Sequence, residues 1–344
     1  MTVRVGILGA TGAVGQRFIQ LLADHDRFEV AALTASSDSA GKPYSEAAKW
    51  RASGPIPSSV ADITVTETTP EAVSSEVPLL FSALPSGVAE RVEPGFVEAG
   101  YIVSSNASND RLAEDIPLVI PEVNAEHLAL LEVQRDERGW DGALVKNPNC
   151  STITMVPPLA ALDTFGLSAI RVATLQAVSG AGYAGVTSME IIDNVLPHIG
   201  GEENKMETET RKLLGEFDGA TIDWHDVSIA ASCNRVATLD GHLENVWIET
   251  EDDLAPARAE QALEAAPTVD LPSAPDELIR VFDDPNRPQP RLDRNIEGGQ
   301  AVAVGPIQET PWGIQFDCLA HNTIRGAAGA SLLNGELLVE RGYL

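Results

Sequence analysis

Three glycines near the start of the chain, Gly9, Gly12 and Gly15, constrain the fold more than any other feature of the sequence. They follow an apolar run at 3–8 that has the length of a β-strand, and they open a helical pattern that includes Phe18. Glycine lets a backbone approach a pyrophosphate, and a helix N-terminus offers free N–H groups and the positive end of its dipole. The spacing departs from the commoner G-x-G-x-x-G, and a tight strand-to-helix turn is the alternative reading. We predict a dinucleotide site because the motif lies between a strand and a helix.

Strand-like and helix-like segments alternate up to about residue 150, which predicts an α/β fold with a parallel, Rossmann-type sheet. After that point the strand-like segments are longer and fewer helices separate them, as in an α+β domain with an open mixed sheet. The Pro- and Asp-rich stretch at 267–295 is expected to be irregular. We expect strands at 3–8, 28–34, 63–67, 79–84, 101–104, 118–120, 143–146, 169–178, 227–231, 243–249, 301–304 and 314–319, and helices at 88–98, 155–162 and 323–340.

Acidic residues outnumber basic ones by 51 to 23, which gives a formal net charge of −28. A charge of this sign opposes binding to nucleic acid and to anionic membranes. The acids are scattered along the chain, which favours a solvated coat suited to a salt-rich cytoplasm. An anionic substrate would therefore need a local basic pocket.

The sequence shows no pattern typical of secretion, membrane insertion or metal binding. Its first residues lack the layout of a signal peptide, and no apolar run approaches the ~20 residues that span a bilayer. The three cysteines are too few for a disulfide framework, and the six histidines show no ligand spacing with cysteine or acid. We expect a cytoplasmic protein with no metal, no nucleic-acid partner and no membrane partner.

The end of the expected strand at 28–34 bears on the choice between NAD and NADP. An acidic residue there accepts hydrogen bonds from the ribose hydroxyls and repels a 2′-phosphate. Ser36 and Ser37 leave room for a phosphate, whereas Asp38 argues against it unless its side chain points into solvent. A serine-rich surface loop is the alternative, so the residues alone leave the choice open.

Cys150 follows Asn147-Pro148-Asn149 and lies at the head of an expected helix. A helix N-terminus favours the thiolate, which is the attacking form of cysteine. We predict a nucleophile here, with a buried structural cysteine as the alternative. Cys233 and Cys318 lie inside strand-like runs and are expected to be structural.

Three further motifs carry candidate functional groups. A strand breaks into a glycine-rich loop at 176–185, where a ring or a phosphate could lie against the backbone. Glu202 and Lys205 share one face if their segment is helical, although a solvated ion pair is the usual outcome. Arg235 could bind a carboxylate, and His242 could act as an acid or base. The alternative for both is a surface side chain with no functional role.

Taken together, these motifs resemble the aspartate-β-semialdehyde dehydrogenase family in its archaeal and fungal branch, nearly from end to end. The resemblance implies NADP-dependent reductive dephosphorylation of aspartyl phosphate to aspartate semialdehyde, on the route to lysine, methionine and threonine. The matching stretches are Gly-Ala-Thr-Gly-Ala-Val-Gly at 9–15, Ser-Ala-Leu-Pro-Ser at 82–86, Pro-Glu-Val-Asn at 121–124, Asn-Pro-Asn-Cys-Ser-Thr at 147–152, Gln-Ala-Val-Ser-Gly-Ala-Gly at 176–182, Glu-Glu-x-Lys-Met at 202–206, Arg235 with His242, and His-Asn-Thr-Ile-Arg-Gly-Ala-Ala-Gly at 321–329.

The resemblance also implies a role for each matching residue. Cys150 would be the nucleophile, His242 the acid–base residue and Gln176 the group that orients a thioester intermediate. The substrate would be bound by Arg235 at its α-carboxylate, Glu202 at its ammonium, and Arg111 and Lys205 at its phosphate, with Asn149 nearby. The cofactor would contact Gly9, Thr11, Gly12, Ala13, Val14, Gly15, Ser36, Ser37, Ser179, Gly180, Gly182 and Asn322.

The implied architecture is an NADP-binding domain at 1–149 and 323–344 and a catalytic and dimerisation domain at 150–322, assembled as a homodimer or homotetramer. Asp38 departs from the family, which is expected to have a basic residue there, so NAD stays an alternative cofactor. The alternative functions are N-acetyl-γ-glutamyl-phosphate reductase, malonyl-CoA reductase and a non-catalytic nucleotide-binding regulator. The first would not need Glu202 for an ammonium group, and the second would need a coenzyme A site in place of Arg111 and Lys205.

Overall fold

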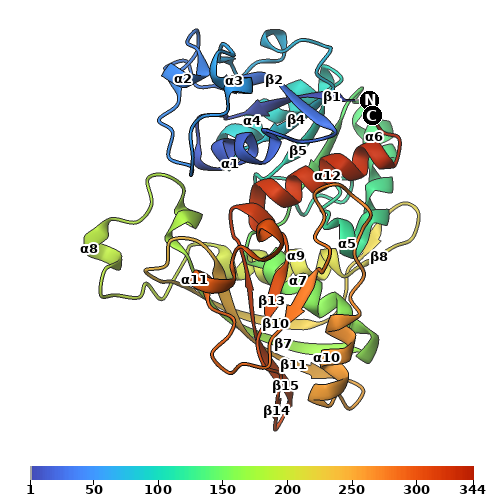
Figure 1. Cartoon of the computed structure of the whole chain (residues 1–344). Helices are drawn as coiled ribbons and strands as arrows, with labels where there is room; N and C mark the ends of the chain where they lie inside the picture. Colours follow the sequence, from blue (N-terminus) through green and yellow to red (C-terminus); the bar gives the residue numbers. More distant parts are fainter. Residues whose placement is uncertain (1) are drawn as a thin grey trace.

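A computed structural model describes residues 2–344 and contains two main β-sheets, each with its own helices (Figure 1). This arrangement confirms the predicted fold class, a Rossmann-like parallel sheet joined to a mixed sheet. Within the described residues, no helix is both long enough and apolar enough to cross a membrane.

The first sheet has six parallel strands in the order β3-β2-β1-β4-β5-β6. The order reverses beside β1, and ligands of open α/β sheets bind outside the carboxyl ends of the strands at such a point. The strands are β1 (Val3–Leu8), β2 (Phe28–Ala35), β3 (Thr66–Glu67), β4 (Leu79–Ser82), β5 (Ile102–Ser105) and β6 (Ala143–Lys146). The helices of this part are α1 (Ala13–Leu22), α2 (Tyr44–Ala47), α3 (Ser58–Ala61), α4 (Ser86–Glu98), α5 (Pro121–Asn124) and α6 (Leu130–Arg138), with short 3₁₀ turns η1 (Pro70–Ala72) and η2 (Ala125–Ala129).

The second sheet is mixed, in the order β10-β7-β11-β15-β13-β12, with β14 paired to β15. β10 runs parallel to β7, whereas β11 is antiparallel to both of its neighbours. The strands are β7 (Leu167–Gln176), β10 (Ser228–Arg235), β11 (His242–Thr250), β12 (Ile279–Val281), β13 (Val302–Val304), β14 (Gln308–Thr310) and β15 (Gly313–Ala320), and a separate hairpin joins β8 (Glu216–Phe217) to β9 (Ile222–Asp223). The helical segments are α7 (Thr152–Leu162), α8 (Ser188–Ile191), α9 (Glu202–Leu213), α10 (Pro256–Glu264) and α11 (Pro290–Asp293), with turns η3 (Asp163–Phe165), η4 (Val178–Ala181) and η5 (Ile296–Gly299).

The end of the chain crosses back to the first sheet. A π-helical turn, η6 (Ile324–Ala328), leads into α12 (Gly329–Glu340), which packs against β4 and β5 (Figure 1). A Cβ at Gly335 would lie 2.8 Å from the ring of Phe81, so this glycine lets helix and sheet approach closely. The hydroxyls of Ser104 and Ser331 lie 2.7 Å apart in the same contact. These contacts hold α12 against the first sheet.

Three sequence expectations are wrong in detail. The segment at 118–120 forms only an isolated bridge, between Leu118 and Lys146, because Pro117 and Pro121 bracket it and proline cannot donate to a sheet ladder. The strand expected at 63–67 shrinks to β3, which pairs with only the last two residues of β2. The stretch at 267–295 is not wholly irregular, since it contributes β12 to the second sheet.

Candidate functional site

The glycine turn lies between β1 and α1 at the carboxyl edge of the first sheet. Gly9 has φ +81°, and a Cβ there would lie 3.1 Å from the carbonyl oxygen of Ala83. A Cβ at Gly15 would lie 2.3 Å from the carbonyl oxygen of Gly9, so Gly15 allows the helix to pack on the turn. Beside the turn is a groove of about 730 Å³. Its lining includes the predicted cofactor residues Gly9, Thr11, Gly12, Ala13, Val14, Ser36, Ser37 and Gly182, but not Gly15.

The part of this groove at the end of β2 lacks a basic residue. Ser36 and Ser37 line it together with Glu67, and none of its lining residues within the described chain is lysine or arginine. Asp38 is exposed and does not line the groove, and its carbonyl oxygen accepts a hydrogen bond of 2.8 Å from Lys42 Nζ. The geometry therefore leaves space for a 2′-phosphate without supplying a cation for it.

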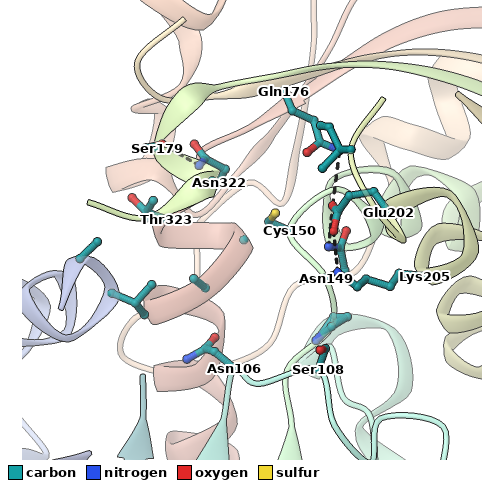
Figure 2. A pocket seen from close by; sticks show the side chains of 18 of the residues that line it. Asn106, Ser108, Asn149, Cys150, Gln176, Ser179, Glu202, Lys205, Asn322 and Thr323 are labelled. Atoms are coloured by element: carbon teal, nitrogen blue, oxygen red, sulfur yellow. Dashed lines mark hydrogen bonds and ion pairs between the residues drawn. The ribbon is translucent and has the colours of Figure 1, made fainter. Parts of the chain in front are cut away.

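A second cavity, of about 350 Å³, adjoins the groove where the two sheets approach each other (Figure 2). Ala13, Val14 and Gly182 line both the cavity and the groove, so the two are continuous. The predicted residues that line the cavity are Ala13, Val14, Arg111, Asn149, Cys150, Gln176, Ser179, Gly180, Gly182, Glu202, Lys205, Arg235 and Asn322. The structure thus brings most of the predicted site together from both parts of the chain.

Cys150 is placed by the turn that joins β6 to α7. The Asn149 side chain caps this helix, because its Oδ1 accepts hydrogen bonds from the N–H groups of Ser151 at 2.9 Å and Thr152 at 3.2 Å. Behind Cys150 lies Gly326 of the π-helical turn, where a Cβ would come within 2.7 Å of the Cys150 Cβ. The backbone of η6 therefore packs directly against the cysteine.

His242 begins β11 and is fully buried beside the cysteine. Its Nε2 lies 3.3 Å from Cys150 Sγ, and its Nδ1 accepts a hydrogen bond of 3.1 Å from the Ala177 N–H. Because Nδ1 is an acceptor, the neutral ring carries its proton on Nε2 and directs it at the sulfur. Burial lowers the pKa of His242 to about 3, and Arg235 adds to the decrease. The imidazole is neutral near pH 7.

The pKa of the Cys150 thiol is raised in the structure, whereas the sequence predicts a lowered pKa at a helix N-terminus. Burial raises the pKa of the Cys150 thiol to about 12, and Glu202 adds to the rise, while Arg235 and Arg111 oppose it. The helix N-terminus does not offset this loss of hydration, so Cys150 is a neutral thiol near pH 7.

Gln176 and Arg235 end the adjacent strands β7 and β10 and are register partners. Arg235 Nη1 donates a hydrogen bond of 2.8 Å to the carbonyl oxygen of Ala177. A Cβ at Gly180 would lie 2.8 Å from the same Nη1, so this glycine leaves space for the guanidinium. Gln176 Oε1 is buried and has no hydrogen-bond partner among the residues described, which leaves an acceptor at the cavity wall.

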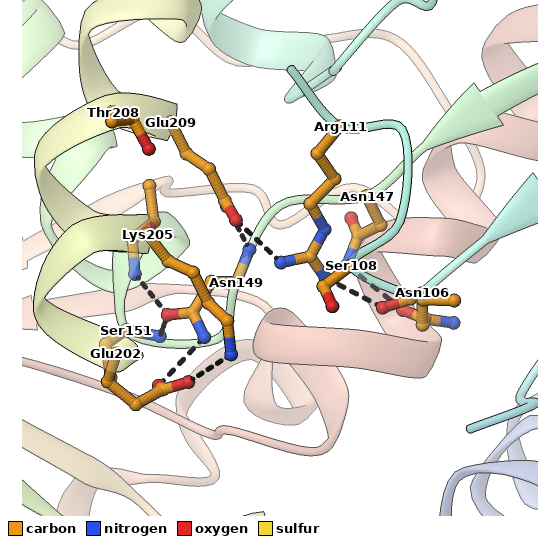
Figure 3. Close-up of polar contacts among 12 residues, drawn as sticks. Asn106, Ser108, Arg111, Asn147, Asn149, Ser151, Glu202, Lys205, Thr208 and Glu209 are labelled. Atoms are coloured by element: carbon orange, nitrogen blue, oxygen red, sulfur yellow. Dashed lines mark hydrogen bonds and ion pairs between the residues drawn. The ribbon is translucent and has the colours of Figure 1, made fainter. Parts of the chain in front are cut away.

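Helix α9 supplies the carboxylate and the ammonium of the cavity (Figure 3). Glu202 Oε1 accepts a hydrogen bond of 2.7 Å from Lys205 Nζ, and its Oε2 accepts one of 2.9 Å from Asn149 Nδ2. Arg111 reaches the cavity from the loop after β5. The cavity is therefore basic as predicted for an anion site in this acidic chain, with Arg111, Lys205 and Arg235 around it.

The loop at 177–182 joins the cavity to the cofactor groove. Asn322 Nδ2 donates a hydrogen bond of 2.8 Å to Ser179 Oγ, and Asn322 Oδ1 accepts one of 2.8 Å from the Gly241 N–H. In Figure 2 this pair lies on one side of Cys150, and Gln176 and Glu202 lie on the other. A flat group entering from the groove would meet the sulfur between them.

Sequence reasoning missed several residues of the site. Asn106 and Ser108 line the cavity just after β5, and the general position of ligands beyond the ends of parallel strands could have identified them. Glu209 lies one helical turn beyond Lys205 on α9 and contacts Arg111. Glu244 is buried on the same face of β11 as His242, and burial raises its pKa well above the usual range.

The other titratable candidates behave as structural residues. Cys233 and Cys318 are buried inside strands and unpaired, as the sequence predicts. Across residues 2–344, no three side chains of His, Cys, Asp or Glu are grouped as metal ligands.

Comparison with known proteins gives matches over both parts of the chain. A family model described as the NAD binding domain of semialdehyde dehydrogenase matches residues 4–131, and one described as its dimerisation domain matches 156–325. The aspartate-semialdehyde dehydrogenase of Archaeoglobus fulgidus is 50% identical over 341 residues, covering 99% of each chain. That of Methanothermobacter thermautotrophicus is 51% identical over 346 residues, covering 98% of this chain and 99% of the relative. A crystal structure of the Candida albicans aspartate semialdehyde dehydrogenase with NADP is 41% identical, covers 100% of both chains and has a TM-score of 0.91.

Proposed function

This chain belongs to the aspartate-semialdehyde dehydrogenase family, and on that premise we propose which of its residues perform the reaction. The family interconverts aspartyl 4-phosphate and aspartate 4-semialdehyde. The observation that carries the proposal is the Cys150 Sγ, 3.3 Å from His242 Nε2, in a basic cavity continuous with the dinucleotide groove. The relatives do not favour the alternative functions.

In the proposed first step, Cys150 attacks the acyl carbon and the bond to the phosphate oxygen breaks, which leaves a thioester. The thiol proton leaves with the phosphate, so charge is balanced. His242 Nε2–H is placed to stabilise negative charge on the sulfur during the attack. A covalent intermediate splits one difficult substitution into two easier steps.

In the second step the thioester carbonyl is reduced and the sulfur leaves again. A bound nicotinamide supplies the hydride for this reduction. Gln176 is placed to orient the thioester. The departing sulfur takes up one proton to return to the thiol, and His242 Nε2, 3.3 Å from Sγ, is placed to relay that proton. The loop at 179–182 and Asn322 would hold the cofactor end that faces Cys150, with the groove residues binding the remainder.

The substrate groups are matched to charges around the cavity. We assign the α-carboxylate to Arg235, the ammonium to Glu202, and the phosphate to Arg111 and Lys205 with Asn149 beside them. Arg111 and Lys205 supply two positive charges for a doubly charged phosphate inside a protein whose formal net charge is −28. Glu202 already binds Lys205 and Asn149, so it is fixed in place for an incoming ammonium.

Replacing Arg235 by lysine should raise the KM for aspartate semialdehyde by about tenfold, with kcat within about twofold, because lysine cannot make the two parallel hydrogen bonds of a guanidinium. Steady-state kinetics measures both constants. Arg211→Lys is the matched control, since Arg211 Nε donates to the His225 carbonyl oxygen at 2.8 Å and is not among the cavity residues. An unchanged KM for Arg235→Lys would remove Arg235 from the carboxylate site.

A direct test of the proposed function compares three acyl donors. Aspartyl phosphate should be reduced, whereas N-acetylglutamyl phosphate and malonyl-CoA should not, in a coupled assay repeated across salt concentrations. Turnover of either alternative donor without turnover of aspartyl phosphate would refute the assignment. The salt series also tests the salt-adapted character that the scattered acids suggest.

For the cofactor we propose NADP, with Ser36 and Ser37 at the 2′-phosphate. Asp38→Arg should raise the selectivity for NADPH over NADH by about tenfold, because a guanidinium reaching in from this exposed position would pair with that phosphate, for which the described groove lining supplies no cation. Asp26→Arg makes the same change of charge before the start of β2 and should leave the selectivity as it is. If Asp38→Arg also leaves it unchanged, the end of β2 does not select the cofactor.

The assignment of domains and assembly rests on the same family. We propose a cofactor domain at 1–149 and 323–344 and a catalytic domain at 150–322, with the return of α12 to the first sheet as support. The match to a dimerisation domain supports self-association, and we propose a homodimer or a homotetramer. The proposed place of the reaction is in lysine, methionine and threonine biosynthesis.

A further inference from the structure

Glu209 is a buried carboxylate between two parts of the proposed active site, and the steps above give it no role. It is only 2% exposed. Its Oε1 accepts a hydrogen bond of 2.8 Å from Arg111 Nη1, and its Oε2 accepts one of 2.6 Å from the backbone N–H of Asn149 (Figure 3). One side chain thus connects the arginine of the phosphate site with the residue that precedes Cys150.

The position of Glu209 follows from the periodicity of α9. Glu202, Lys205 and Glu209 are three and four residues apart, so they lie on one face of the helix, and Lys212 continues the row. Lys212 Nζ is buried and donates to three carbonyl oxygens of the loop at 111–116, at 2.9, 2.7 and 2.7 Å. The helix therefore fixes the loop backbone through Lys212 and the arginine side chain through Glu209.

Two contacts set the orientation of the Arg111 guanidinium. Glu209 binds Nη1, and the carbonyl oxygen of Asn106 accepts a hydrogen bond of 2.7 Å from Nη2. Of the donors that these contacts leave, Nε is buried and has no partner among the described residues, although Arg111 lines the cavity. Because the guanidinium is planar, two fixed ends determine its plane. Without Glu209 only one contact would hold it.

We infer that Glu209 is a positioning residue that holds Arg111 in place for the phosphoryl group and fixes the position of Arg111 relative to Cys150. A cation that is oriented before the ligand arrives loses little freedom on binding, so its contact contributes more to affinity. The inference rests on the proposed roles of Arg111 and Cys150. A merely structural ion pair would instead contribute to folding and leave phosphate binding unchanged.

The test uses the phosphorylating direction, with semialdehyde, inorganic phosphate and oxidised cofactor. Glu209→Gln has one acceptor oxygen in place of two, so its amide NH₂ must face one of the two donors that Glu209 now binds. We expect the KM for phosphate to rise about tenfold, the effect of losing one charge-assisted hydrogen bond. The KM for semialdehyde should change by less than about twofold. Equal changes in both constants, or none, would overturn the inference.

Glu207→Gln is the matched control on the same helix. Glu207 Oε1 accepts a hydrogen bond of 3.2 Å from the Ala231 N–H, on a neighbouring strand and not at the cavity, so the same loss of charge should leave the KM for phosphate unchanged. A rise in both variants would show a general effect of charge and contradict a specific role for Glu209.

A double-mutant cycle with Arg111→Ala separates the inference from its premise. Arg111→Ala alone should raise the KM for phosphate, and Glu209→Gln should add nothing further in that background. If Arg111→Ala has no effect, the assigned phosphate site and the inference both fail. If Arg111→Ala has the expected effect but Glu209→Gln has none, or has an additive one, only the inference fails.

A measurement without turnover completes the test. Inorganic phosphate should protect Cys150 from alkylation by iodoacetamide, and Glu209→Gln should raise the half-protecting concentration about tenfold, in line with the KM change. Glu209→Asp, which keeps the charge but is too short to reach both partners, serves if the glutamine variant does not fold. An unchanged half-protecting concentration would overturn the inference.

Discussion

Cys150→Ala should lower kcat for the reduction of aspartyl phosphate by on the order of 10⁴-fold, as removal of a covalent nucleophile does in other enzymes. Cys150 Sγ is the reactive group of the cavity, and Cys233 and Cys318, both buried, cannot replace it. The dinucleotide groove lies outside the substitution, so the variant should still bind the cofactor, measured by equilibrium titration. Activity that survives in the alanine variant would show that Cys150 is not the nucleophile.

Alkylation of the wild-type enzyme tests the same residue in another way. Iodoacetamide should modify Cys150, with loss of activity, and mass spectrometry of the digested protein locates the label. Because burial raises the thiol pKa to about 12, the enzyme holds little thiolate near pH 7, and the rate should rise about tenfold per pH unit through the alkaline range. A plateau above pH 7 would indicate a pre-formed thiolate, and a label on Cys233 or Cys318 would contradict the assignment.

The glycine turn could be predicted from the sequence because its requirements are local. A strand, three glycines and a helix follow one another within the first 22 residues, and each has its own signature. The segment at 118–120 could not be assigned in the same way. It is apolar like a strand, but whether it pairs depends on prolines at both ends and on a neighbour, β6, that lies 25 residues further along the chain. Pairing partners are a tertiary property, and local pattern does not encode them.

The residues of the site could be named from their motifs, but their electrostatics could not. Cys150 and His242 are 92 residues apart, and only the fold brings Sγ and Nε2 to 3.3 Å. The thiol pKa was expected to fall because the helix N-terminus is visible in the sequence, whereas the burial that raises the pKa is not. Glu209 was missed for a related reason, since a carboxylate on a charged helix is usually solvated.

The position of the His242 ring proton, on Nε2, is determined by the hydrogen bond that the other ring nitrogen, Nδ1, accepts. Nδ1 accepts the Ala177 N–H, so Nε2–H must face the sulfur, and no carboxylate among residues 2–344 is hydrogen-bonded to the ring. A pKa lowered to about 3 keeps the ring neutral at every pH at which the enzyme is assayed. For the free enzyme, kcat/KM should therefore show no inflection near pH 6.5, where an ordinary histidine would titrate. Such an inflection would mean that the ring titrates as if exposed to solvent.

Replacing His242 by glutamine should lower kcat by about 10²-fold or more, the range for loss of a general acid–base group, while the KM for semialdehyde changes by less than about threefold. A glutamine carbonyl can accept the Ala177 N–H and its amide can face the sulfur, so the shape of the site is preserved, but an amide cannot give up or take up a proton. His198→Gln is the control, because His198 is exposed and lies outside the cavity. Steady-state rates at saturating substrate decide the matter, and a kcat equal to that of the wild type would mean that the imidazole near the sulfur takes no part in the chemistry.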